Sequence, residues 1–114
     1  MENDPNIKIN KAGYSIIIFS GNSDPMHEAD DNVDIQVNLS NGSYYSGTFF
    51  TLKNIQTIFE KNKRTGECAS GLYFSCPDLV VVETLNAKII ERVIGLLVET
   101  GELDEVFERQ SDST

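Results

Sequence analysis

The chain has 114 residues, a length that suits one domain with its own hydrophobic core. Hydrophobic residues make up 39% of it, which excludes wholesale disorder. The 18 acidic residues outnumber the 9 basic ones and give a net charge of −9, so a nucleic acid or an anionic membrane is not expected among its partners. Such a charge favours a basic protein partner. The alternative is that the charge only keeps the protein soluble.

The start of the chain, MENDPNIKIN, lacks the basic and apolar regions of a signal peptide. We therefore expect a cytoplasmic protein, and free thiols at both cysteines. Residues 1–114 are expected to form a single domain. Its ends, at about 1–12 and 110–114, are polar, and we expect the first of them to be frayed.

The first strong pattern is Tyr14–Ser20, a β-branched and aromatic run that predicts a strand buried on both faces. Residues 21–31 contain Gly, Pro and Asn without periodicity and predict a loop. Val33–Leu39 alternates between apolar and polar residues, which predicts a strand with one face open to water. The open face would carry Asp34, Gln36 and Asn38.

Next comes Asn41-Gly42, a strong signal for a hairpin turn, with Tyr44–Phe50 as the returning strand. Thr51 can cap a helix that runs to about Thr65, and Gly66 would end it. The basic residues in the last turn of this helix suit its dipole, and we prefer that interpretation to an anion site.

The following segment predicts two short strands, Leu72–Ser75 and Leu79–Glu83, joined by a turn at Pro77. The second is continuously apolar and is expected to be central in the sheet. Asn86 is expected to cap the most buried helix, residues 87–100, where Gly95 would allow close packing.

A short helix around 103–107 would follow, so the predicted element order is β-β-β-α-β-β-α-α. This order predicts an α+β domain, with an antiparallel sheet of about five strands and the helices on one face.

No catalytic motif is present. Cys68 and Cys76 are too far apart in sequence for the C-x-x-C of zinc and redox sites, and His27 is the only histidine. We therefore expect structural thiols, no enzyme activity, and no metal or cofactor. The acids at 24–34 lack the calcium-binding EF-hand pattern. A small metal-dependent or thiol enzyme remains the alternative of a different class.

One stretch of the chain resembles a group of small, poorly characterised bacterial proteins. The matching features, spread over about residues 33–108, are Thr48-Phe49-Phe50-Thr51, Thr65-Gly66-Glu67, Tyr73-Phe74 and Asp78-Leu79-Val80-Val81-Val82. The chain departs from that pattern at Ser75-Cys76-Pro77, where the group has an aromatic residue after the "YF". The resemblance implies a partner of a bacterial toxin, as in contact-dependent growth inhibition or polymorphic toxin systems, and it implies no catalytic residues.

Charge and resemblance together predict an immunity-type protein, a toxin inhibitor that binds a cognate, basic, nuclease-like toxin domain through an acidic surface. The expected partner-binding residues are Asp24, Glu28, Asp30, Asp31, Asp34, Gln36 and Asn38. A second choice is the C-terminal acidic group, which we define as Glu99, Glu102, Asp104, Glu105 and Glu108. A regulatory or structural subunit, including a homodimer formed through a sheet edge, is the remaining alternative.

Overall fold

The computed structural model describes residues 6–20 and 28–111. Its elements are β1 (Ile7–Lys11), β2 (Tyr14–Phe19), β3 (Asn32–Leu39), β4 (Ser43–Thr51), α1 (Leu52–Thr65), α2 (Glu67–Gly71), β5 (Leu79–Val82), α3 (Ala87–Thr100), α4 (Leu103–Val106) and β6 (Arg109–Ser111). The predicted α+β class is confirmed, and the sheet formed by the described residues has six strands.

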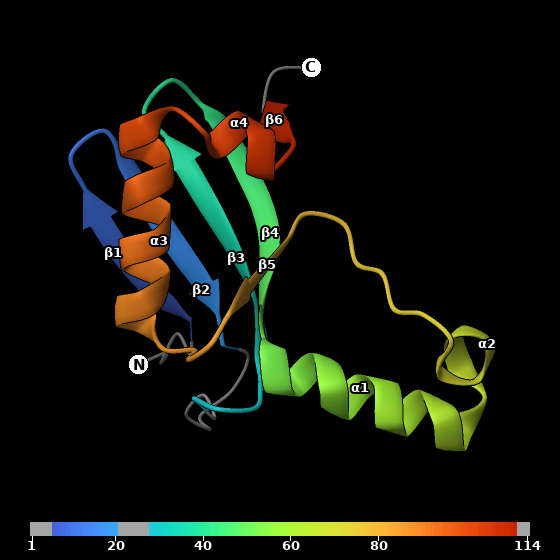
Figure 1. Cartoon of the computed structure of the whole chain (residues 1–114). Helices are drawn as coiled ribbons and strands as arrows, with labels where there is room; N and C mark the ends of the chain where they lie inside the picture. The colour runs from blue at the N-terminus through green and yellow to red at the C-terminus, as the bar shows by residue number, and fades with distance from the viewer. Residues whose placement is uncertain (1–5, 21–27, 112–114) are drawn as a thin grey trace, which may run out of the picture.

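Four strands, β1 to β4, follow one another in an antiparallel meander (Figure 1). The far edge of β4 has two partners, because β6 pairs antiparallel with its beginning and β5 pairs parallel with its end. A parallel neighbour requires a crossover connection of a dozen or more residues. Residues 52–78, which we call the arm, provide that connection.

The β3–β4 hairpin forms at the predicted place, but its loop has three residues, 40–42, and of the Asn41-Gly42 pair only Gly42 has a positive φ. Gly42 has a positive φ of 92°, and its N–H donates to the carbonyl of Leu39 at 3.2 Å. Glycine adopts this backbone conformation without steric cost. The turn sets a register in which Asp34 lies opposite Thr48 and Val33 lies opposite Phe49.

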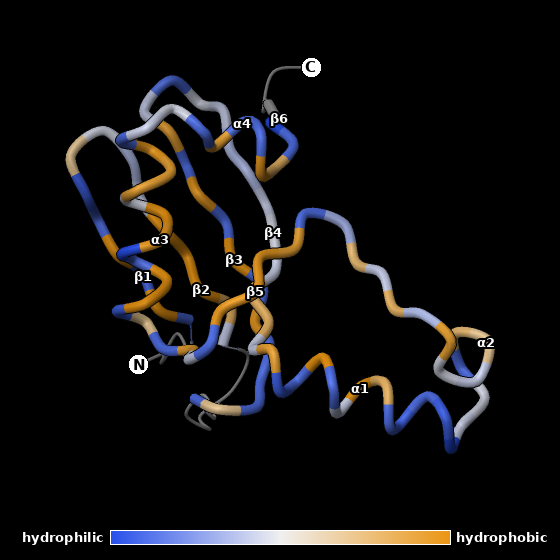
Figure 2. Tube along the Cα trace, viewed as in Figure 1, coloured by the Kyte–Doolittle hydropathy of each residue, from blue (hydrophilic) through white to orange (hydrophobic). Residues whose placement is uncertain are grey.

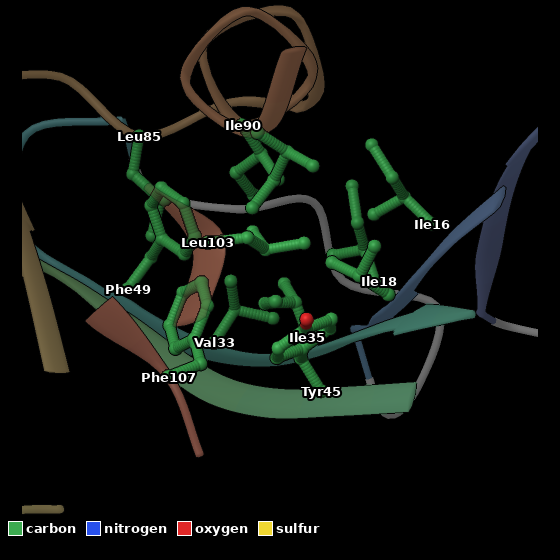
Figure 3. Packing of buried hydrophobic residues seen from close by; sticks show 12 residues of the cluster. Ile16, Ile18, Val33, Ile35, Tyr45, Phe49, Leu85, Ile90, Leu103 and Phe107 are labelled. Carbon is green, nitrogen blue, oxygen red and sulfur yellow. The ribbon is translucent and has the colours of Figure 1, made fainter. Parts of the chain in front are cut away.

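One face of the sheet is the core. Side chains from β2, β3 and β4 meet those of α3 there, and Figure 3 shows Ile90 directed at the strands. The fully buried side chains include Ile16, Ile18, Val37, Phe49, Ile90 and Ile94. The prediction of a well-buried helix at 87–100 is confirmed, with Asn86 as its cap through a 2.9 Å bond from the Ile89 N–H.

Phe107, just after α4, lies directly against Gly47 of β4. A Cβ at Gly47 would come within 2.1 Å of the Phe107 ring and 2.9 Å of the Asp78 carbonyl oxygen. The close approach of three segments therefore depends on the missing side chain at Gly47. Gly95 has no such role, because a Cβ there would meet only the Tyr14 hydroxyl at 3.6 Å. The close-packing prediction for Gly95 is wrong.

Several other predictions differ from the structure. Ile7–Lys11 forms a strand rather than a frayed end, while residues 1–5 of that prediction lie outside the described residues. Arg109–Ser111 forms a further strand, and residues 72–75 do not form one. β2 is buried on one face only, since Phe19 is 40% exposed. β5 lies at an edge rather than in the centre of the sheet.

Helices α3 and α4 contribute to the core, but α1 does not. Thr51 caps α1 and Gly66 ends it at φ 87°, as predicted. The helix nevertheless extends away from the sheet (Figure 1), and none of its residues belongs to the core cluster. Figure 2 shows the far end of α1 as strongly hydrophilic. The arm therefore projects from a compact body.

The two glycines make a matched pair of substitutions. Gly47→Ala should lower the free energy of unfolding by at least about 2 kcal/mol, because the new methyl group overpacks against Phe107 and a backbone carbonyl. Gly95→Ala should raise it by about 0.5–1 kcal/mol, because alanine favours a helix interior and has room. Urea denaturation with an unchanged m-value measures both. Equal effects would contradict the packing of Phe107 on Gly47.

Candidate functional site

The second face of the sheet, which we call the open face, carries the polar residues of β3. Asp34, Gln36 and Asn38 alternate with the buried Val33, Ile35 and Val37, as the sequence predicts. On this face Phe19, Asp34, Thr48 and Leu79 stand opposite one another across β2, β3, β4 and β5. The alternation of strands thus brings an aromatic ring, a carboxylate and a hydroxyl into one row.

Hydrogen bonds hold the polar groups of this face in place. The Thr48 hydroxyl donates to Asp34 Oδ1 at 2.8 Å, and Gln36 Nε2 donates to Asn38 Oδ1 at 2.7 Å. The pairs join side chains that neighbour one another on the sheet surface, so their geometry follows from the register. The face is an ordered polar surface.

The open face is hollowed beside Asp34. A hollow of about 320 Å³ is lined by Phe19, Asp34, Ile35, Ser46, Gly47, Thr48, Pro77 and Asp78. Its wall is the turn at 77–78, which is predicted by the Pro77-Asp78 pair and fixed by a 3.1 Å bond from the Thr48 N–H to the Asp78 carbonyl. Asp78 has a φ of 53°, a left-handed conformation that Asp tolerates better than most residues.

Two of the described acids of the 24–34 segment, Asp30 and Asp31, have a structural task. Asp30 accepts bonds from Asn54 Nδ2 at 2.9 Å and from the Thr57 hydroxyl at 3.0 Å. Asp31 Oδ1 accepts from the Asn32 N–H at 2.8 Å. Glu28 is exposed, and its carbonyl accepts from the Leu85 N–H at 2.8 Å. Asp24 lies outside the described residues. Asp30 and Asp31 thus fasten the loop to the start of α1.

Thr51 joins these parts. It is fully buried, and its hydroxyl accepts from the Asn54 N–H at 3.0 Å and from the Asp31 N–H at 3.2 Å. Its own N–H donates to the Asp31 carbonyl at 3.0 Å. The helix cap and the loop anchor are therefore the same residue.

Thr51→Val keeps the side-chain shape but removes the acceptor. It should lower the free energy of unfolding by about 1–2 kcal/mol, because two N–H groups lose their partner. Amide hydrogen exchange at Asp31 and Asn54 should become faster. Thr51→Ser, which retains the hydroxyl, should leave both amides protected. Unchanged exchange in Thr51→Val would contradict the shared cap.

The C-terminal acidic group surrounds the end of α3 and α4, far from α1 (Figure 1). All of its members are exposed. Asp104 also holds the fold, because it accepts from the buried Tyr45 hydroxyl at 2.7 Å and lies 3.9 Å from Arg109 Nε. The Arg109 guanidinium carbon is 5.8 Å from the centre of the Tyr45 ring, a cation–π distance.

Burial raises the pKa of Tyr45, and the hydrogen bond to Asp104 raises it further. The neutral phenol is thus favoured by folding. Its contribution to stability is complete below the pKa of an unfolded tyrosine, about 10, and is lost as pH rises through the higher folded pKa. Unfolding measured from pH 8 upward should show stability falling more steeply above about pH 10 in the native chain than in Tyr45→Phe. Parallel curves would contradict this coupling.

The arm contains both cysteines. It also contains the basic cluster, which we define as Lys61, Lys63 and Arg64 at the end of α1. Cys68 and Cys76 are free thiols. Cys68, Ala69 and Ser70 have φ values of 51°, 54° and 60°, so α2 is a left-handed turn. Glu67 lies 3.6 Å from Lys61, and its pKa is lowered by a hydrogen bond from Thr65 and by this lysine. The basic cluster is thus partly neutralised within the arm.

Sequence reasoning identified Asp34 but not the residues that surround it. A two-residue turn at Asn41-Gly42 would have placed Phe49 opposite Asp34, whereas the observed loop of three residues, 40–42, places Thr48 there. No local pattern indicates that Phe19 and Asp78 lie beside them, because both positions depend on pairing between distant segments.

No protein-family model matches the chain, and no curated protein or solved structure matches it significantly. Within residues 6–20 and 28–111, no three side chains of His, Cys, Asp or Glu are grouped so as to hold a metal ion. None of the helices in those same ranges is both long and apolar enough to cross a membrane.

Proposed function

We propose that this chain is an immunity-type protein, which binds a cognate, basic bacterial toxin and neutralises it by covering the cleft where the toxin binds its substrate. Carboxylates of the chain take the places of substrate phosphates in that cleft. The net charge of −9 supports this proposal, because a basic nuclease-like domain would be drawn to such a surface.

The observation that carries the proposal is the open face. Helices α3 and α4 pack on the core face, so the polar side chains along β3, Asp34, Gln36 and Asn38, face outward on a rigid sheet. Rigid, ordered polar groups bind a partner with little loss of side-chain freedom. Phe19 and Val81, which are 40% and 48% exposed on the same face, add apolar area for a protein contact.

Charge distribution favours one side of the molecule. The bases of α1, Lys53, Lys61, Lys63 and Arg64, would repel a basic toxin. The C-terminal acidic group would attract it, and so would Asp34 on the open face, where Lys8 is the basic residue of β1. The resemblance to small bacterial partners of toxins is independent of this charge argument. It supports a protein ligand rather than a substrate.

The proposal predicts that a large secreted protein with a basic C-terminal domain is encoded next to this chain, and the test uses that domain. We expect that domain to bind the chain and to lose its toxicity when the two are co-expressed. Glu28→Lys with Asp34→Lys should slow association roughly ten-fold or more at low salt, because charge is reversed at two of the acids expected to bind the toxin. Stopped-flow or surface plasmon resonance measures the rate.

The matched control is Glu99→Lys with Glu105→Lys, which changes the net charge equally at the far acidic group. It should slow association much less. The reverse order of effects would move the contact to the C-terminal acidic group. Rates unaffected by either pair would contradict an acidic docking surface altogether.

A further inference from the structure

The hollow on the open face has the size and chemistry of a pocket for one side chain. Its volume of about 320 Å³ lies at the lower end of the range for ligand sites, roughly 300–1,000 Å³. The residues that line it come from four places in the chain: the end of β2, β3, β4, and the turn at 77–78. Long-range pairing therefore builds the hollow before any ligand arrives.

Two acidic residues, Asp34 and Asp78, line the hollow, and none of its lining residues is basic. Asp34 accepts one bond, from the Thr48 hydroxyl, through Oδ1. The Asp78 carboxylate has no hydrogen bond or ion pair with the described part of the chain, and only its backbone carbonyl is engaged. A positively charged group that enters the hollow could donate charge-assisted hydrogen bonds to both carboxylates.

The aromatic wall decides which cation fits best. Phe19 stands directly opposite Asp34 on the neighbouring strand, and its ring is 40% exposed. A planar guanidinium can stack on such a ring while its N–H groups donate to a carboxylate, whereas an ammonium is a compact, strongly hydrated charge. A divalent metal would need about six oxygen ligands, which this half-apolar hollow does not provide.

We propose that the hollow binds the guanidinium side chain of an arginine presented by a partner protein. The preference for a guanidinium is inferred from the residues that line the hollow. Only the source of the arginine, a basic toxin, rests on the proposed function.

The pocket is preformed. The Thr48 N–H holds the Asp78 carbonyl at 3.1 Å, and the Phe107 ring fills the space behind Gly47 on the core side. Side chains that need little rearrangement lose little entropy on binding.

The experiment titrates the whole chain with N-acetyl-arginine amide and follows backbone amides by ¹H–¹⁵N NMR. The amides of Thr48, Asp78 and Leu79 should show saturable shifts. N-acetyl-citrulline amide, which has the same shape but no charge, should bind at least ten-fold more weakly. Equal shifts with both probes, or no saturable shift with either, would overturn the proposal.

Variants locate the binding. Asp34→Asn with Asp78→Asn removes both charges, keeps an acceptor for the Thr48 hydroxyl, and leaves at position 78 a residue that tolerates positive φ. Arginine affinity should fall at least ten-fold in this variant. Glu60→Gln with Glu83→Gln, which removes the same charge elsewhere, should retain it. An affinity for the arginine probe that falls equally in both double variants would show that only the net charge matters. That result would overturn the proposed pocket.

The same variants separate this inference from the proposed function. Arginine binding to the native chain, together with a neighbouring toxin domain that does not bind, would support the pocket and overturn the immunity function. A toxin domain that binds the Asp34→Asn, Asp78→Asn variant as tightly as the native chain, with no arginine binding, would overturn the pocket alone.

Discussion

The register of the β3–β4 hairpin is the constraint on which the rest of the structure depends. A slip of one residue would turn Asp34, Gln36 and Asn38 into the core and Val33, Ile35 and Val37 out to water. The buried side chains of the apolar set, at most 6% exposed, oppose such a slip, and the three-residue loop at 40–42, with Gly42 at positive φ, opposes it locally. Burial of the apolar face in the core therefore fixes the positions of the side chains on the polar face.

The two faces are coupled at Gly47. On the core side the Phe107 ring lies against it, and on the other side it lines the hollow. The next residue, Thr48, binds the Asp78 backbone through its N–H and the Asp34 carboxylate through its hydroxyl. Tight packing in the core therefore determines where two carboxylates lie on the surface, since a densely packed interior leaves the strand little freedom to shift.

Local signals in the sequence predicted local structure well. The place of the β3–β4 hairpin, the caps Thr51 and Asn86, and the stop Gly66 are all where the residue types indicate. Pairing between distant segments was not predictable: Ile7–Lys11 and Arg109–Ser111 become strands only because β2 and β4 offer them an edge. The same limit applies to the hollow, where alternation predicted Asp34 but nothing local predicted Phe19 or Asp78.

Composition alone also cannot separate acids that hold the fold from acids available to a partner. Asp30, Asp31 and Asp104 already accept hydrogen bonds from α1, the backbone and Tyr45, so their carboxylates serve mainly to position segments. These residues still contribute to the long-range field, which depends on the sum of charges. Asp34 and Asp78 differ because their carboxylates can accept further hydrogen bonds, and both residues lie at a preformed surface. Rates of encounter would thus depend on all exposed acids, whereas the lifetime of a complex would depend on the few carboxylates that a partner neutralises directly.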